Sequence, residues 1–154
     1  MIALLQRVSE AWVEISKKPI ARIGPGLLVL VGVEAGDGPA EARRLAEKTC
    51  NYRIFPDTDG QMNLDVTAAG GAILAVPQFT LAADTRRGNR PGFSTAAPPA
   101  AAEPLFMEYV AALRMRMEQV GTGQFGADMS VGLVNQGPVT FWLQVRPPGS
   151  GTVR

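Results

Sequence analysis

The chain has 154 residues, 46% of them hydrophobic and 19% charged, which is typical of one ordinary globular domain with a sizeable core. The net charge of +1 excludes a global attraction to nucleic acid, so any such attraction must come from a local patch. There is no histidine and Cys50 is the single cysteine, which excludes Ser-His-Asp and Cys-His nucleophile systems, His-ligated or Cys-rich metal sites and an internal disulfide framework.

The same composition bears on where and how the protein works. No apolar run approaches the roughly 18 residues that a membrane helix needs. The apolar start at residues 2–5 is too short for a signal peptide and is soon followed by Arg7. A single cysteine fits a reducing compartment, so we expect a cytoplasmic protein. An enzyme of this composition must use carboxylates, hydroxyls, backbone dipoles or groups of its substrate, and we expect neither a cofactor nor a metal.

Hydrophobic periodicity predicts strands in the first third of the chain at 1–9, 11–16, 20–23 and 27–33. The last of these is almost entirely aliphatic, which indicates a strand buried on both faces. A helix is expected to start at Gly36-Asp37-Gly38-Pro39, with proline in its first turn. Cys50 falls on the apolar stripe of this helix, so we interpret it as a small buried hydrophobe and not as a nucleophile.

The remainder of the chain predicts further strands at 52–55, 62–64, 73–76, 129–134 and 139–145. A second helix is expected to open at Pro104, and its core stripe is Leu105, Tyr109, Leu113, Met117 and Val120. The order of strands, helix, strands, helix and strands has no internal repeat. It predicts an α+β fold, a mixed sheet covered by two helices.

One domain is therefore expected over residues 1–146, and the Pro-, Gly- and Ser-rich residues 147–154 are expected to form a mobile tail. Gly121-Thr122-Gly123-Gln124-Phe125-Gly126 matches the dinucleotide-binding fingerprint literally. That motif must follow a strand and open a helix, whereas here it follows a helix and precedes a strand. We therefore interpret it as a glycine-rich connector.

Two stretches break the local rules of strands. The apolar run at 73–76 ends in Pro77-Gln78-Phe79-Thr80, and Asn135-Gln136-Gly137-Pro138-Val139-Thr140 separates two strand-like runs. Proline removes a ladder donor, and buried Gln and Thr side chains need hydrogen-bond partners. Irregular edge strands and functional sites both produce such breaks, so the pattern alone leaves the two interpretations open.

The long segment 82–99 has no clear periodicity, and loops of this length in a compact domain are usually functional or disordered. It contains Arg86, Arg87 and Arg90 against Asp84, which gives a local charge of +2 (3 − 1). A solvated charged loop and a phosphate clamp both fit this pattern, because arginine suits bidentate contact with phosphate.

With these motifs in view, the chain resembles the D-aminoacyl-tRNA deacylases from residue 1 to about residue 145. The matching motifs are Gln6-Arg7-Val8, Gly24-Pro25-Gly26-Leu27-Leu28-Val29, Asn51-Tyr52-Arg53-Ile54-Phe55, Met62-Asn63-Leu64, Gln78-Phe79-Thr80-Leu81, Ala83-Asp84-Thr85-Arg86, Arg90-Pro91, Ala96-Ala97-Pro98-Pro99, Phe125-Gly126-Ala127-Asp128-Met129 and Asn135-Gln136-Gly137-Pro138-Val139-Thr140.

The resemblance implies a mostly antiparallel, barrel-like sheet and a cytoplasmic homodimer with active sites at the subunit interface. It implies hydrolysis of the ester that joins a D-amino acid, or glycine, to the terminal adenosine of tRNA, without a cofactor or metal. Gln78, Phe79 and Thr80 would be the catalytic residues and line the pocket floor and adenosine site. Gly137-Pro138 would be a cis peptide that reaches into the partner's pocket. Arg7, Arg86, Arg87 and Arg90 would contact the tRNA.

Pro77 departs from the family pattern, which usually has serine at this position. A related animal deacylase that removes mischarged L-alanine carries proline there, but it lacks the phenylalanine found here at Phe79. An L-alanyl-tRNA editing enzyme of the same fold is therefore one alternative. A non-catalytic RNA-binding module is another, against which we count the weak basicity and the expected lack of clustered exposed aromatic residues.

An aminoacyl ester is already activated, so no strong protein nucleophile is needed. We hypothesise that the main-chain N–H groups of Phe79 and Thr80 form an oxyanion hole. The 2′-hydroxyl of the terminal ribose would activate the attacking water, as the family's RNA-assisted mechanism implies. The carbonyl groups of Gly137-Pro138 would accept a D-amino acid and clash with an L side chain.

Overall fold

The computed structural model describes residues 1–149. The strands are β1 (Ile2–Ile15), β2 (Lys18–Ile23), β3 (Gly26–Gly32), β4 (Phe55–Pro56), β5 (Met62–Leu64), β6 (Ala72–Pro77), β7 (Val120–Thr122) and β8 (Ser130–Gln144). The helices are α1 (Pro39–Asn51), α2 (Pro99–Arg114) and the 3₁₀ helix η1 (Phe79–Ala82).

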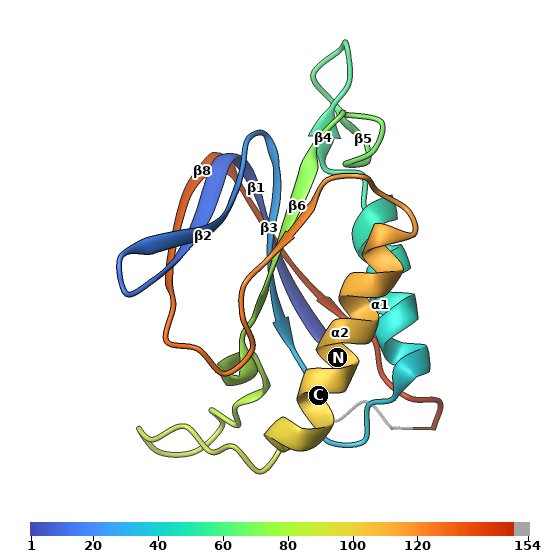
Figure 1. Ribbon diagram of the computed structural model, residues 1–154. Coiled ribbons are helices and arrows are strands. Elements are labelled where there is room, and N and C mark those ends of the chain that lie inside the picture. Colours follow the sequence, from blue (N-terminus) through green and yellow to red (C-terminus); the bar gives the residue numbers. More distant parts are fainter. Residues whose placement is uncertain (150–154) are drawn as a thin grey trace.

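Strand β1 is the centre of the six-stranded sheet (Figure 1). One of its edges pairs with β8 along most of its length, and the other pairs first with β3 and then with β2, all antiparallel. The two separate strands expected at 1–9 and 11–16 are wrong, since they form one strand. No glycine or proline interrupts it, and Glu10 continues the ladder by pairing with Val134.

The sheet is mixed because β6 pairs parallel with both β3 and β7. Gly26 allows β3 to approach β6, since a Cβ atom at Gly26 would lie 1.9 Å from the carbonyl oxygen of Ala72. The sheet then curls on itself, so that Ala21 and Ile23 of β2 lie against Gly121 of β7. Three antiparallel and two parallel strand pairs in this sheet agree with the mostly antiparallel, barrel-like arrangement that the resemblance implied.

Both helices cover one face of the sheet (Figure 1). Tyr109 and Leu113 of the expected α2 stripe lie in the core, and Phe106 and Val110 are buried beside them. Between the helices, the Thr49 hydroxyl donates to the Leu45 carbonyl and lies 2.9 Å from the Tyr109 hydroxyl, so the buried polar atoms are paired. The α+β class with two covering helices is confirmed.

Helix α2 differs from the expected helix at both ends. It begins at Pro99 and not at Pro104, which lies inside it. Pro104 cannot donate to the carbonyl of Ala100, but both residues are exposed, so that carbonyl faces water. The helix ends at Arg114, and Val120 belongs to β7, which corrects the connector interpretation of Gly121 as well. The strand expected at 52–55 is likewise displaced, to Phe55–Pro56.

Cys50 is buried on α1 as expected, and desolvation raises the pKa of its thiol to about 11. Residues 150–154 of the expected tail lie outside the described residues. None of the helices in residues 1–149 is both long and apolar enough to cross a membrane.

Candidate active site

A pocket of about 790 Å³ opens where β6 ends. Its wall combines the end of β6, the loop before α2 with the start of that helix, and the connector before β8. The lining residues are Val76, Pro77, Gln78, Phe79, Phe93, Ser94, Ala96, Ala97, Pro98, Pro99, Ala102, Phe125, Gly126, Ala127, Asp128, Met129 and Val131. The pocket is mainly apolar, and the size is in the range of small-molecule sites.

Gln78, Phe79 and Thr80 lie at the edge of this pocket, at the turn from β6 into η1. The main-chain N–H of Gln78 donates to the Val31 carbonyl at 2.7 Å, which fixes the turn to β3. Within residues 1–149 the N–H groups of Phe79 and Thr80 find no acceptor, as is usual in the first turn of a helix. The Gln78 amide donates to the Thr80 hydroxyl. Two free donors are thus held beside the pocket.

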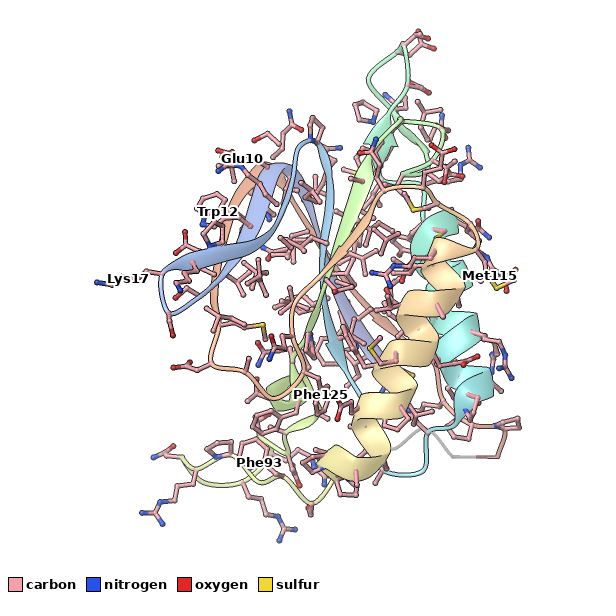
Figure 2. All side chains as sticks on the ribbon, viewed as in Figure 1. Glu10, Trp12, Lys17, Phe93, Met115 and Phe125 are labelled. Atoms are coloured by element: carbon pink, nitrogen blue, oxygen red, sulfur yellow. The ribbon has the colours of Figure 1, made fainter. Side chains whose placement is uncertain are left out.

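Aromatic rings stand at the pocket mouth. Phe79 is 56% exposed and Phe93 43% exposed, and their ring centroids are 5.1 Å apart. Figure 2 shows Phe93 and Phe125 at the lower end of the molecule, and both line the pocket. The expectation of no clustered exposed aromatics was therefore wrong, because residues distant in sequence meet here. No pattern in the sequence gave Phe93 a role, and Phe125 belongs only to a motif of the family resemblance.

The second irregular stretch is a bulge within one continuous strand, β8, and not a break between two strands. Val8 of β1 pairs with Asn135 and Gln6 pairs with Thr140, so four residues of β8 lie opposite the single residue Arg7. The Asn135 side chain closes the bulge: its carbonyl accepts from the Val139 N–H at 2.8 Å, and its amide donates to the Thr140 hydroxyl at 2.9 Å. Strand β8 therefore continues past Pro138.

At the tip of the bulge, Gly137 and Pro138 are exposed and the peptide bond between them is cis. Gly137 has φ of +129°, and a Cβ atom there would lie 2.7 Å from Val139 Cγ2 and 3.1 Å from Arg7 Nη2. Arg7 supports the bulge from β1, since its Nε donates to the Gln136 carbonyl at 3.3 Å and its Nη1 to the Ile54 carbonyl at 2.7 Å. Both of these donors point at main chain of the same protomer.

The two irregular stretches do not meet within one protomer. Gly137 of β8 lies opposite Arg7 of β1. Arg7 pairs with Leu27 of β3, and Leu27 pairs with Ile73 of β6. Gln78 comes five residues after Ile73. That offset is roughly 16 Å along the strands, with three strand spacings of roughly 14 Å across the sheet. An active site that uses both stretches therefore needs a second copy of the chain.

Main-chain hydrogen bonds close the loop at residues 84–92, and an ion pair neutralises part of its positive charge. Asp84 and Gly92 exchange main-chain hydrogen bonds of 2.7 and 3.0 Å. Arg86 donates from Nε and Nη2 to the two carboxylate oxygens of Asp84, both at 2.8 Å. Arg87 and Arg90 are exposed and make no ion pair among the described residues. Arg86 therefore holds the loop, and the two free cations are Arg87 and Arg90.

The Asp84–Arg86 pair has a testable titration. Hydrogen bonds from the Arg86 side chain and main chain hold the pKa of the Asp84 carboxyl well below its usual range. A depressed pKa means that the pair's contribution is present above the ordinary carboxyl pKa and is lost only as the pH falls through the lower, folded-state value. NMR titration of the Asp84 carboxyl carbon should show this low midpoint. Arg86→Gln should move it up toward the ordinary value of about 3.9; an unmoved midpoint would mean that Arg86 does not hold the loop.

Comparisons with known proteins show the family of the chain. The family model of D-Tyr-tRNA(Tyr) deacylase matches residues 4–144. The D-aminoacyl-tRNA deacylase of Alteromonas mediterranea is 57% identical over 145 residues, which cover 94% of this chain and 100% of that protein. The protein of the same name from Marinobacter nauticus is 55% identical over 154 residues, with 99% of each chain covered.

Two solved structures share the fold. The c-Myc DNA unwinding element binding protein superposes with a TM-score of 0.91 at 35% identity, covering 96% of this chain and 100% of that one. A probable eukaryotic D-amino acid tRNA deacylase superposes with a TM-score of 0.80 at 16% identity, covering 94% and 98%, which shows the fold alone. By the family match and the sequence identities over nearly the whole length, the chain belongs to the D-aminoacyl-tRNA deacylase family.

Proposed function

We propose that this protein hydrolyses the ester joining a D-amino acid to the terminal adenosine of tRNA, in the cytoplasm. The names of its relatives support the reaction class. The observation that carries the proposal is the apolar pocket at the end of β6, beside two N–H donors that find no acceptor within residues 1–149. A volume of about 790 Å³ leaves room for a nucleoside and part of an amino acid.

The rings of Phe79 and Phe93 suit the adenine of the terminal nucleotide. Bases stack on exposed aromatic side chains whatever their identity, with about 1–3 kcal/mol for each stacked base. Because the two rings meet at the pocket mouth, a base bound there would leave the ester near the η1 turn. The adenosine would then be the part of the substrate that positions the bond to be cut.

In the proposed chemistry, water adds to the ester carbonyl carbon, and the N–H groups of Phe79 and Thr80 stabilise the oxyanion. The carbon–oxygen bond to the ribose then breaks, and the proton released by the water ends on the ribose oxygen. The neighbouring 2′-hydroxyl of the substrate would take the place of a protein base. This scheme fits a chain without histidine.

Selection of the D form is proposed to come from Gly137-Pro138 of the partner subunit in a homodimer. These residues are exposed on a bulge that Arg7 and Asn135 hold, and they lie far from the pocket of their own protomer. Main chain held in this way would accept a D-amino acid and clash with an L side chain, whereas glycine has no side chain to exclude. We therefore include glycyl-tRNA among the substrates.

Contacts to the rest of the tRNA are assigned to cations near the two motifs. Arg87 and Arg90 are exposed and form no ion pair with the described part of the chain, so they suit acceptor-stem phosphates, while Arg86 would act by positioning their loop. Arg7 stays a proposed tRNA contact, although two of its donors already bind main-chain carbonyls.

One experiment separates the proposal from its alternatives. The half-lives of D-tyrosyl-, L-tyrosyl-, L-alanyl- and glycyl-tRNA are measured with and without added protein. Shortened half-lives for the D-tyrosyl and glycyl esters alone would support the proposal. A short half-life for L-alanyl-tRNA alone would assign the protein to L-alanine editing, which Pro77 in the pocket wall would favour. No change in any half-life, with tRNA still bound, would leave an RNA-binding module.

A further inference from the structure

A second hollow, of about 350 Å³, lies between α1 and the end of β8. Its lining residues are Arg44, Glu47, Lys48, Gln144, Val145 and Arg146, and we call it the basic hollow. Arg44 and Lys48 are four residues apart, so they share one face of α1. Arg146 follows β8 and meets them from the other side. Three cations against one carboxylate give a local charge of +2 (3 − 1).

The ion pairs of the described residues leave out all three cations of the basic hollow. Among residues 1–149, Arg44, Lys48 and Arg146 form no ion pair, although Glu47 is close by. The neighbouring Arg43 does pair, at 2.6 Å with Glu108 of α2. Lys48 in the last turn of α1 complements the helix dipole, but this accounts for neither Arg44 nor Arg146. The three cations are therefore free for an outside partner.

The basic hollow lies at the same end of the sheet as the proposed adenosine pocket. Gln144 pairs with Ile2, Ile2 pairs with Gly32, and the N–H of Gln78 binds the carbonyl of Val31 next to Gly32. The hollow is thus about three strand spacings, roughly 14 Å, from Gln78. Between them, the Glu34 carboxylate is bound by the Gln144 amide, at 2.8 Å to each oxygen.

The lining indicates the kind of partner. All three cations are exposed, and the hollow has no aromatic side chain on which a base could stack. It also has no buried polar side chain of the kind that encloses a small anion. Long, exposed cations on an open surface suit the phosphates of a nucleic-acid backbone, which are bound without regard to sequence.

We propose that the basic hollow binds phosphates of the RNA whose terminal adenosine occupies the pocket. The inference rests on the proposed function and adds to it a second cationic surface, separate from Arg87 and Arg90. It places backbone phosphates of the substrate against α1, where they raise affinity without touching the ester.

The test compares a triple variant, Arg44→Gln with Lys48→Gln and Arg146→Gln, with a matched variant that loses three charges elsewhere. The control changes are Lys17→Gln, Lys18→Gln and Arg114→Gln; Figure 2 shows Lys17 at the tip of the β1–β2 hairpin, on the opposite side from α1. Each protein is assayed on D-tyrosyl-tRNA and on the small ester 3′-O-D-tyrosyl-adenosine, over a series of salt concentrations.

The hollow variant should raise KM for D-tyrosyl-tRNA about tenfold at low salt and leave the small ester unaffected. The slope of log KM against log salt should fall by roughly two, since each lost phosphate contact removes about 0.7–0.9. Arg44→Lys with Arg146→Lys keeps the charge and should keep the wild-type KM. An equal thermal midpoint would show that the fold is intact.

Other results would overturn the inference. An equal rise of KM in the control variant would indicate an effect of net charge alone. An equal rise of KM for the small ester would indicate damage to the pocket. If the wild-type protein bound pyrophosphate and the triple variant did not, while the variant's KM for tRNA stayed unchanged, the hollow would be a site for small anions. If the wild-type protein hydrolyses neither ester, the proposed function fails, and fluorescence anisotropy with uncharged tRNA still decides whether the hollow binds RNA.

Discussion

Thr80→Pro is expected to lower kcat for D-tyrosyl-tRNA by about 10²–10³-fold, the effect of removing one oxyanion donor worth about 2.7–4 kcal/mol. Proline deletes the N–H of residue 80, which finds no acceptor among residues 1–149. It also removes the hydroxyl that accepts from the Gln78 amide, and Thr80→Ala removes the same hydrogen bond. Position 80 is also in the first turn of η1, where proline is tolerated. Single-turnover kinetics with bound substrate measure this step directly.

Thr80→Ala is the matched control, since it removes the hydroxyl and keeps the N–H. It breaks the hydrogen bond from the Gln78 amide, so a reduction in kcat of less than tenfold is expected. If Thr80→Ala abolished activity while tRNA still bound, the hydroxyl would be the reacting group. The mechanism would then be that of a threonine nucleophile.

Gly137→Ala should reduce kcat/KM for D-tyrosyl-tRNA at least a hundredfold. The added Cβ would lie 2.7 Å from Val139 Cγ2 and 3.1 Å from Arg7 Nη2, at a φ of +129° that L-residues rarely adopt. The bulge must therefore shift, and with it the main chain proposed to sort D from L substrates. The strain should also lower the free energy of unfolding by about 1–3 kcal/mol, measured by urea denaturation.

Gly70→Ala separates the loss of stability caused by backbone strain from the loss of activity caused by a shifted bulge. Gly70 also has positive φ, but a Cβ there meets nothing within 4 Å, and it lies outside the pocket lining. It should lower stability by about 1 kcal/mol and leave kcat/KM unchanged. Retention of full, D-selective activity by Gly137→Ala would show that the bulge does not shape the substrate site.

Periodicity was a sufficient guide where burial decides the structure. The helix around Tyr109 and the buried strand β3 were predicted correctly, because their side chains face the core. It failed where the main chain continues through residues that usually stop it. Pro138 does not end β8, because the Asn135 side chain closes the bulge, and Pro104 does not open α2, because Ala100 can leave its carbonyl in water.

The sequence predicted only some of the site residues, for a related reason. A local irregularity singled out Gln78, Phe79 and Thr80, and the family resemblance gave them a catalytic role. Gln78 and Phe79 line the pocket, and Thr80 follows them in η1. Phe93 gave no such signal, since its meeting with Phe79 depends on how the loop before α2 folds back. The pairing of Arg86 with Asp84 could not be separated in the sequence from a cluster of three free arginines.

The distance between the β8 bulge and the η1 turn has a genetic consequence. In the proposed symmetric dimer, each site takes its pocket from one chain and its Gly-Pro main chain from the other. A Thr80→Pro chain and a Gly137→Ala chain would each be inactive alone. Mixed and allowed to exchange subunits, they would form hybrids with one intact site, so about a quarter of wild-type activity should return. Two alleles, each dead by itself, would complement each other in one cell.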